Sequence, residues 1–173
     1  MRVEKLSDIK KELRSLNTES LTEICLRLAK YKKDNKELLS YLLYEAENPI
    51  NYAEEVKASL LVNFQNLNRS SYTSTKELRK IVRLLAKHAK YTGSKEVELE
   101  LLLWFCSNFI EFADTRSSHK PLQAIFGRQM EKVKKILPKL HEDLQFDYST
   151  TYNQLVEEAD SRVRFFNKND FII

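Results

Sequence analysis

The chain has 173 residues, of which 42% are hydrophobic and 31% charged, and it contains only two glycines, three prolines and two cysteines. Glycine normally makes up about 7% and proline about 5% of a soluble protein, so this scarcity excludes a fold built on hairpins and predicts a nearly all-helical chain. The formal net charge is +4, and no segment has the roughly 18 uninterrupted apolar residues that a membrane span needs.

The N-terminal segment and the cysteines indicate where the protein works. The first thirty residues carry charge throughout and contain no apolar stretch of signal-peptide length. We therefore expect a cytoplasmic protein with no membrane partner. Cys25 and Cys106 are both embedded in apolar helical patterns, which predicts two reduced thiols in the core instead of a disulfide or a metal site.

Apolar residues recur at helical spacing through almost the whole chain, and this pattern predicts about eight helices. The first is expected over residues 7–15. Asn17 has the position of an N-cap for the second helix, which places Cys25 on its apolar face. A third helix is expected after Asp34 and Glu37, because their spacing is that of a capping box.

The middle of the chain contains three further predicted helices. The fourth follows Pro49. Ser74 and Glu77 also have capping-box spacing and predict the start of the fifth helix, which Gly93 ends. The sixth helix opens at Ser94 and is apolar nearly all round, so we expect it to lie in the centre of the fold.

The last two helices and a tail complete the chain. Pro121 suits the first turn of the seventh helix, and Pro138 is expected to kink or divide it. The eighth helix is expected to follow residues 148–150. A short apolar tail occupies residues 167–173, and its last three residues, 171–173, are expected to fold back over the end of the helical array.

The short connections between these helices decide the predicted architecture. Consecutive helices joined by short loops pack antiparallel, so helices separated by one run parallel in the same layer. We expect a single all-α domain over residues 1–173, either a short two-layer αα-superhelix of the HEAT-like kind or an irregular helical bundle. No residue-level repeat signature is found, so the superhelix rests on the run of paired helices.

Catalytic and metal motifs are missing from the sequence. Phosphate-cradling loops need several glycines, and the chain has only Gly93 and Gly127. None of the three histidines follows a glutamate or another histidine at a metal-binding spacing. His141, Glu142 and Asp143 come nearest to a metal or acid–base group, and we interpret them as a solvated helix end. We therefore expect a non-enzymatic protein without metal or cofactor.

Two rows of positive side chains are the stronger functional signal. On the fifth helix a row falls within a sector of roughly 100° opposite the apolar face. It consists of Lys76, Arg79, Lys80, Arg83, Lys87 and Lys90. On the seventh helix a second row recurs at spacings of four, three and four: Arg128, Lys132, Lys135 and Lys139. If the two helices are parallel neighbours, the rows merge into one positive surface.

Two polar loops bear on the same surface. Residues 68–74 lead into the fifth helix, and residues 114–120 lead into the seventh. Parallel helices would place both N-termini at one end of the molecule, where unpaired N–H groups favour anions. Arg69 and Arg116 would then stand near this end and extend the candidate site. Ordinary helix capping is the competing interpretation of these loops.

We interpret the protein as a helical binding module whose basic face contacts an acidic partner, either nucleic acid or an acidic protein. The phosphate backbone of nucleic acid is the leading partner. Tyr31 and Tyr91, which stand beside lysines, are candidates for base stacking. The alternatives are a basic face that is only solvated, and a protein–protein adaptor or self-associating structural protein. The sequence carries no signal for an oligomeric state.

Overall fold

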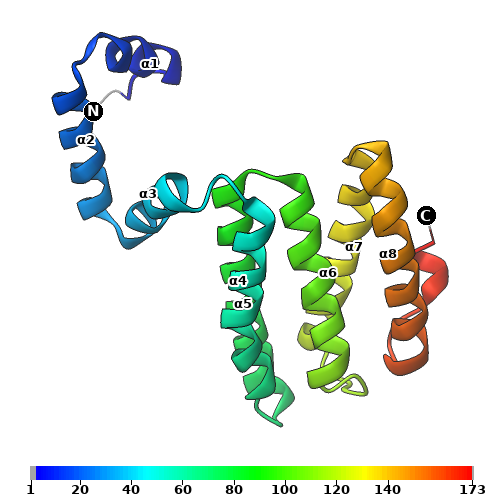
Figure 1. Cartoon of the computed structure of the whole chain (residues 1–173). Coiled ribbons are helices and arrows are strands. Elements are labelled where there is room, and N and C mark those ends of the chain that lie inside the picture. The colour runs from blue at the N-terminus through cyan, green and yellow to red at the C-terminus, as the bar shows by residue number, and fades with distance from the viewer. Residues whose placement is uncertain (1–2, 173) are drawn as a thin grey trace. The chain divides into compact units, whose positions relative to one another are not determined.

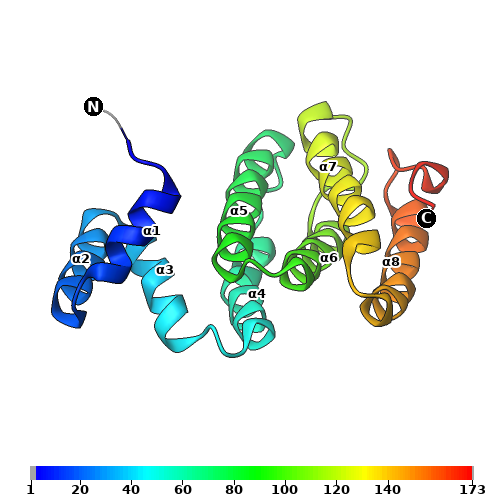
Figure 2. The same ribbon diagram turned by 90° about the horizontal axis from the view of Figure 1, so that it is seen from above.

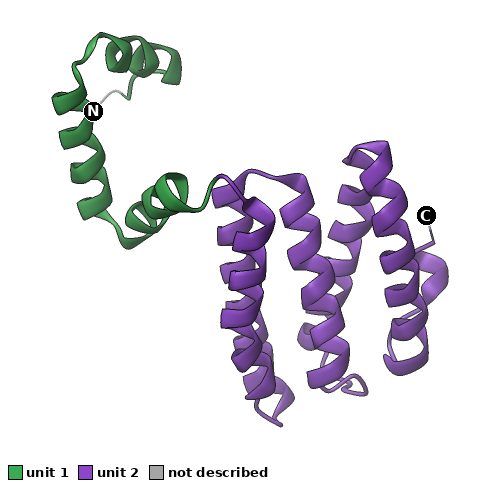
Figure 3. Ribbon diagram, viewed as in Figure 1, with its two compact units in different colours: residues 1–46 green, residues 47–173 purple. Residues whose placement is uncertain are grey.

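The computed structural model describes residues 3–172, which form eight α-helices and two short 3₁₀ helices without any strand. This confirms the all-α fold class. The chain divides into two compact units, residues 1–46 and residues 47–173 (Figure 3). That the two units act as one domain over residues 1–173 stays a prediction.

Unit 1 contains the helices α1 (Leu6–Ser15), α2 (Thr18–Tyr31) and α3 (Lys33–Tyr44) (Figure 1). Asn17 caps α2 as predicted, because its side-chain oxygen accepts a hydrogen bond of 2.8 Å from the Ser20 N–H. The capping box at Asp34 is wrong. Lys32 occupies the N-cap position of α3 without a side-chain capping bond. Helix α2 therefore passes into α3 with only one residue between them.

The helices of unit 1 bury little surface. Tyr41 is the only buried residue among residues 3–46, and burial raises the pKa of its hydroxyl. Cys25 is exposed, so the prediction that its thiol lies in the core is wrong. Leu28 and Tyr31, on the same helix, are 56% and 77% exposed. The physical reason is size: so short a unit has too few apolar residues to cover all faces of its helices.

Unit 2 contains α4 (Pro49–Gln65), α5 (Ser71–Thr92), α6 (Lys95–Phe112), α7 (Lys120–Ile136), η1 (Leu137–Lys139), α8 (Glu142–Arg162) and η2 (Lys168–Asp170). The helices form two layers, with α4, α6 and α8 in one and α5 and α7 in the other (Figure 2). This packing fits the predicted helical bundle or short superhelix.

The boundaries of α5 show which local signals decided its length. The helix begins at Ser71, before the predicted capping box at Ser74, so that box is wrong. The Glu77 carboxylate instead accepts a hydrogen bond of 2.9 Å from the Asn68 N–H and ties down the preceding loop. Gly93 ends the helix as predicted, with a φ of 63° that a residue with a Cβ adopts only under strain.

Helix α6 lies in the centre of unit 2, as its all-round apolar character predicts. It contacts α4, α5, α7 and α8. The Phe105 ring lies 5.5 Å from Phe64 of α4, and the Phe109 ring lies 4.9 Å from Phe126 of α7, between centroids. Cys106 is buried beside these rings as predicted, and burial raises the pKa of its thiol. The core therefore holds α5 and α7 against a common central helix.

Pro138 was predicted to kink or divide the seventh helix, and the structure divides it into α7 and a short 3₁₀ helix. Helix α7 stops at Ile136, and Pro138 lies in η1 because its ring and missing N–H do not fit a continuing α-helix. Helix α8 begins at Glu142, whereas it was predicted to begin only after residues 148–150. Lys139 therefore belongs to η1 and not to α7.

The C-terminal tail folds back at Phe171. This side chain is buried and stacks on Phe166, with ring centroids 4.7 Å apart. The Tyr152 hydroxyl of α8 donates a hydrogen bond of 2.8 Å to the Phe171 carbonyl oxygen. The fold-back prediction is confirmed for Phe171, whereas Ile172 is exposed. Ile173 lies outside the described residues.

Candidate functional site

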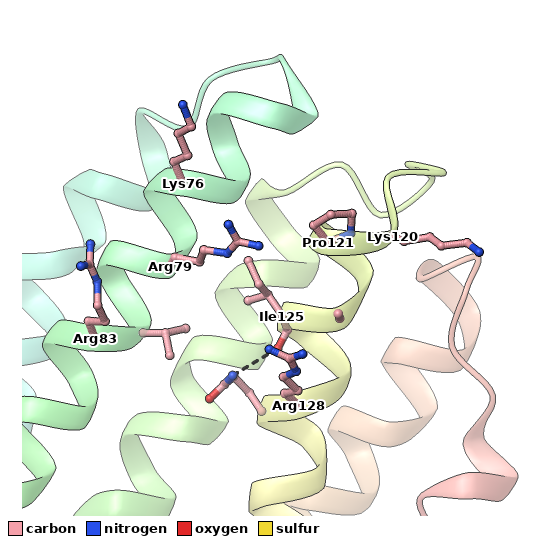
Figure 4. A pocket seen from close by; sticks show the side chains of 10 residues that line it. Lys76, Arg79, Arg83, Lys120, Pro121, Ile125 and Arg128 are labelled. Carbon is pink, nitrogen blue, oxygen red and sulfur yellow. Dashed lines mark hydrogen bonds between the residues drawn. The ribbon is translucent and has the colours of Figure 1, made fainter.

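A groove of about 940 Å³ lies between α5 and α7 on the surface of unit 2 (Figure 4). Its lining, which we call the basic groove, consists of Lys76, Arg79, Val82, Arg83, Lys120, Pro121, Ala124, Ile125, Arg128 and Gln129. Five of these residues are cationic and none is acidic. The structure thus brings three members of the α5 row together with Arg128 of the α7 row.

The two helices that form the groove run parallel. In Figure 4, Lys76, Arg79 and Arg83 follow one another along α5 in the direction in which Pro121 and Arg128 follow along α7. The opposite face of α5 is buried in the core, through Leu78, Ile81 and Leu85. Burial of this apolar face leaves the cationic face turned outward. The parallel arrangement therefore sets cations on both sides of one groove.

The cations of the basic groove have no carboxylate partner. Among residues 3–172, no ion pair involves any of these five side chains. The two acidic residues that interrupt the rows are engaged elsewhere. Glu77 accepts a hydrogen bond from Asn68, and the Glu131 carboxylate lies 3.8 Å from the Lys135 ammonium. The groove therefore keeps its positive charge, which attracts anions along its whole length.

The remaining residues of the α5 row lie outside the groove lining. Lys80 and Lys90 are exposed. Lys87 is half-buried, and its ammonium lies 6.0 Å from the centre of the Tyr91 ring. The predicted row of six thus separates into three residues that line the groove and three that do not.

The α7 row is divided in the same way. Lys132 lines a separate small cavity of about 30 Å³, which lies between α5, α6 and α7. Glu98 lines the same cavity. Lys135 faces Glu131, and Lys139 is exposed on η1. Of the four predicted residues, only Arg128 reaches the basic groove.

The loops before α5 and α7 do meet. The Ser117 hydroxyl donates a hydrogen bond of 2.8 Å to the Ser71 hydroxyl, which donates one of 3.3 Å to the Asp114 carboxylate. Arg69 lines a separate hollow that includes Asp114, and the Arg116 N–H donates to the same carboxylate. Arg69 and Arg116 therefore stand beside a negative charge and outside the basic groove, which weakens their role as anion ligands.

The sequence analysis missed three residues: Lys120 and Gln129 line the groove, and Tyr72 lies outside the lining but beside Lys76. Lys120 ends the predicted loop, yet it is the first residue of α7 and lines the groove. It lies eight residues before Arg128, about 80° away around the helix at 100° per residue, and Figure 4 shows its side chain extending away from α5. Tyr72, in the first turn of α5, is 62% exposed, and the Lys76 ammonium lies 4.4 Å from the centre of its ring. The spacing of four between Tyr72 and Lys76 is the signal that could have found it.

Gln129 is the third such residue, and it lines both the basic groove and the small cavity beside it. Its side chain is 4% exposed. The amide nitrogen donates a hydrogen bond of 3.2 Å to the Ile125 carbonyl oxygen (Figure 4). The amide oxygen is buried and accepts no hydrogen bond within the described part of the chain. The sequence signal for this buried amide is that a glutamine occurs among the apolar residues on the buried face of α7.

Other chemistry is sparse within residues 3–172. No three His, Cys, Asp or Glu side chains come together there as a metal site. His141 Nδ1 lies 3.3 Å from Asp143 Oδ2 at the start of α8, where both side chains are exposed. None of the helices in this range combines the length and the apolar character that a bilayer span requires.

Comparisons of the chain with models of protein families, with curated proteins and with solved structures found no match. A function for this chain therefore rests on the geometry and charge of its own residues. The basic groove is the feature that combines a hollow, an unpaired cluster of charge and contributions from two helices.

Proposed function

We propose that this protein is a non-enzymatic, cytoplasmic module that binds the phosphate backbone of nucleic acid in the basic groove. The observation that carries the proposal is the meeting of five cations from α5 and α7 in one groove whose lining holds no acidic residue. Phosphate oxygens suit such a site, because guanidinium groups bind them with two parallel hydrogen bonds and ammonium groups bind them as point charges.

The spacing of the cations supports contacts to successive phosphates. Arg79 and Arg83 are about 6 Å apart along α5, at 1.5 Å per residue. Lys120 and Arg128 are about 12 Å apart along α7 by the same rise. A strand lying in the groove would therefore meet three cations from α5 and Arg128 from α7, with Lys120 in the first turn of α7. Phosphate contacts of this kind position the nucleic acid and carry little sequence information, so we expect sequence-tolerant binding.

A salt titration with the full-length chain tests this proposal. Fluorescence anisotropy with labelled mixed-sequence RNA and DNA measures the binding constant at increasing salt. If all five cations contact phosphates, the log–log slope should be about −3.5 on a single strand, since each neutralised phosphate contributes about −0.7. Salt-independent binding, or the lack of any binding at low salt, contradicts the proposal.

Charge reversal inside and outside the groove provides the matched comparison. Arg79→Glu combined with Arg128→Glu should weaken binding by about a hundredfold or more, since a hydrogen bond to a charged group contributes about 1.5–3 kcal/mol. Lys80→Glu combined with Lys90→Glu is the control, because it reverses the same number of charges at two exposed residues of α5 that do not line the groove. Circular dichroism should show unchanged helicity for every variant. Equal losses in both variants would show that only net charge matters and not the groove.

Unit 1 supports a second candidate function, that of an adaptor or self-associating protein. Its exposed apolar side chains include Leu26, Leu28, Tyr31, Leu42, Leu43 and Tyr44. Exposed apolar surface on this scale is typical of a protein interface. Sedimentation of the chain over a range of concentrations tests self-association. Replacing Leu42 and Leu43 by serine should abolish any association that this surface causes.

A further inference from the structure

We infer that the nucleic acid held in the basic groove is single-stranded, and that Tyr72 stacks on one of its bases. The inference rests on the proposed function and names the form of nucleic acid that the site selects. It is carried by two features that phosphate binding alone does not require. One is the apolar floor of the groove, and the other is the exposed Tyr72 ring, which lies outside the lining but one helical turn before Lys76.

The apolar floor favours a strand whose bases are accessible. Val82 of α5 and Ala124 and Ile125 of α7 lie in the lining together with the cations. A duplex keeps its bases stacked inside and turns its phosphates outward, so it would contact the cations and leave the floor uncovered. A single strand has unpaired bases that can cover apolar side chains while its phosphates meet the cations.

The arginines of the groove suit both parts of a single strand. A guanidinium group is planar, binds phosphate through paired N–H groups and stacks on the faces of bases. Figure 4 shows the Arg79 side chain extending from α5 toward α7, across the groove. Arg128 lies in the same lining on the other helix. A strand in the groove is therefore within reach of guanidinium groups from both helices.

Tyr72 continues the groove-facing side of α5 toward its N-terminus. It lies four, seven and eleven residues before Lys76, Arg79 and Arg83, spacings that keep side chains on one side of a helix. The ring is 62% exposed, and the Lys76 ammonium lies 4.4 Å from its centre. The lysine can bind a phosphate next to the base that stacks on the ring, which is the pairing of charge and aromatic surface found in single-strand binding proteins.

The two tyrosines that the sequence singled out fit this role less well. Tyr91 is half-buried, and its ring packs against His88 with centroids 5.7 Å apart. Tyr31 is 77% exposed and lies near Lys32, with 5.8 Å between the ammonium and the ring centre, but it belongs to unit 1. Tyr31 therefore serves as a matched control: it is an exposed tyrosine beside a lysine, but no residue of its helix lines the groove, whereas Lys76 beside Tyr72 does.

The strand preference is tested with four labelled probes and the full-length chain. The probes are a mixed-sequence oligonucleotide, the same oligonucleotide annealed to its complement, inorganic polyphosphate and polyglutamate. We expect the single strand to bind about tenfold more tightly than the duplex, since each stacked base contributes about one factor of ten or more. Equal or tighter binding of the duplex overturns the inference and leaves the proposed function standing. Binding of polyglutamate without binding of either nucleic acid overturns both.

The role of Tyr72 is tested by substitution. Tyr72→Leu should weaken single-strand binding by about tenfold, whereas Tyr72→Phe keeps the ring and should retain the affinity. Tyr31→Leu should change nothing. Polyphosphate has no bases, so its affinity should be the same for Tyr72→Leu and the unaltered chain. Full single-strand affinity of Tyr72→Leu, or an equal loss with polyphosphate, overturns the stacking role. Ultraviolet crosslinking gives a second readout. Mass spectrometry should identify Tyr72 as the residue to which a base is crosslinked.

Discussion

The two units of this chain have the same amphipathic helical pattern but differ in how much of it they bury. In unit 2, Leu99 of α6 is completely buried, and aromatic rings from α4, α6, α7, α8 and the C-terminal segment belong to the same core. In unit 1, Leu28 of α2 is 56% exposed and Tyr41 is the only buried residue between positions 3 and 46. Helical periodicity therefore predicts which face of a helix is apolar, but a second layer of helices decides whether that face is buried.

The same difference separates the functional features of the units. The layered helices of unit 2 place cationic residues of α5 and α7 beside one another, and these residues line one groove. Unit 1 buries only Tyr41 among residues 3–46 and presents exposed apolar side chains instead. We therefore assign nucleic-acid binding to unit 2 and association with other proteins to unit 1, as separate hypotheses.

The largest expected effect is on stability. Leu99→Ala should lower the free energy of unfolding by about 2–5 kcal/mol, because it removes buried methyl groups and leaves a cavity. The same substitution at Leu28 should cost less than about 0.5 kcal/mol, as is usual for exposed positions. Urea denaturation followed by circular dichroism measures both. Similar costs at the two positions would show that unit 1 is buried in solution and would break the comparison.

The two cysteines test the comparison chemically. Cys25 is exposed, whereas Cys106 is buried and its pKa is raised by burial, which keeps the reactive thiolate scarce. A thiol reagent should modify Cys25 at least about a hundredfold faster than Cys106, because access to Cys106 requires an opening of the core. Mass spectrometry of the native chain should find one label per molecule, and two after denaturation. Rapid double labelling would contradict a closed core.

Tyr152 links the core of unit 2 to alkaline stability. Burial, followed by smaller contributions from Glu131 and Cys106, raises the pKa of Tyr152 to about 12 from its ordinary value of 10.0. The folded state holds this proton more tightly than the unfolded state. The contribution of the Tyr152 proton to the free energy of unfolding is therefore complete below pH 10. It declines as the pH rises through about 12.

Tyr152→Phe tests this reasoning. The variant should lose about 1 kcal/mol at neutral pH, because the hydrogen bond to the Phe171 carbonyl is gone. Its disadvantage relative to the unaltered chain should shrink above pH 10, since phenylalanine has no proton to lose. Tyr31→Phe, on the exposed surface of unit 1, should leave the unfolding curve unchanged at neutral pH. If the stability difference between the variant and the unaltered chain grew with pH, the raised pKa of Tyr152 would be contradicted.

The smallest expected effect concerns Gln129. Gln129→Leu should raise the free energy of unfolding by up to about 1 kcal/mol. The substitution removes a buried acceptor without a partner, which costs the folded chain about 1–3 kcal/mol. In exchange it loses only one hydrogen bond. Thermal unfolding measures the gain. Gln129→Glu should lower the unfolding temperature, since it buries a charge at the same place. A destabilised leucine variant would show that the amide oxygen has a partner in solution.

Local signals in the sequence predicted much of the fold. The cap at Asn17, the end of α5 at Gly93 and the break at Pro138 depend on the backbone preferences of single residues and their neighbours, and all three are confirmed. Helices α3, α5 and α8 begin two, four and nine residues earlier than predicted. Of the residues by which these helices extend, only Ser74 of α5 is buried, so a capping residue in the sequence does not by itself fix where a helix begins.

The candidate site was predictable only in part. Arg79 and Arg83 were recognised from their place opposite the apolar face of α5, and Arg128 from the row on α7. Lys80 belongs to the same row as Arg79, and no periodicity distinguishes the residue that lines the groove from the one beside it. That distinction depends on the direction in which the neighbouring helix lies. Lys120 and Tyr72 were missed because they stand in first turns, where the sequence resembles a loop.

The sequence by itself determined that this chain is helical, which helix lies in the centre and which faces carry positive charge, because these properties follow from composition and from a period of 3.6 residues. Only the tertiary structure decided that Arg79 and Arg128, far apart in the chain, line the same groove, and that Cys25 stays exposed while Cys106 is buried. The physical reason is that packing is a relation between helices: each helix presents its face alone, but a groove or a core exists only where a second helix covers or flanks that face.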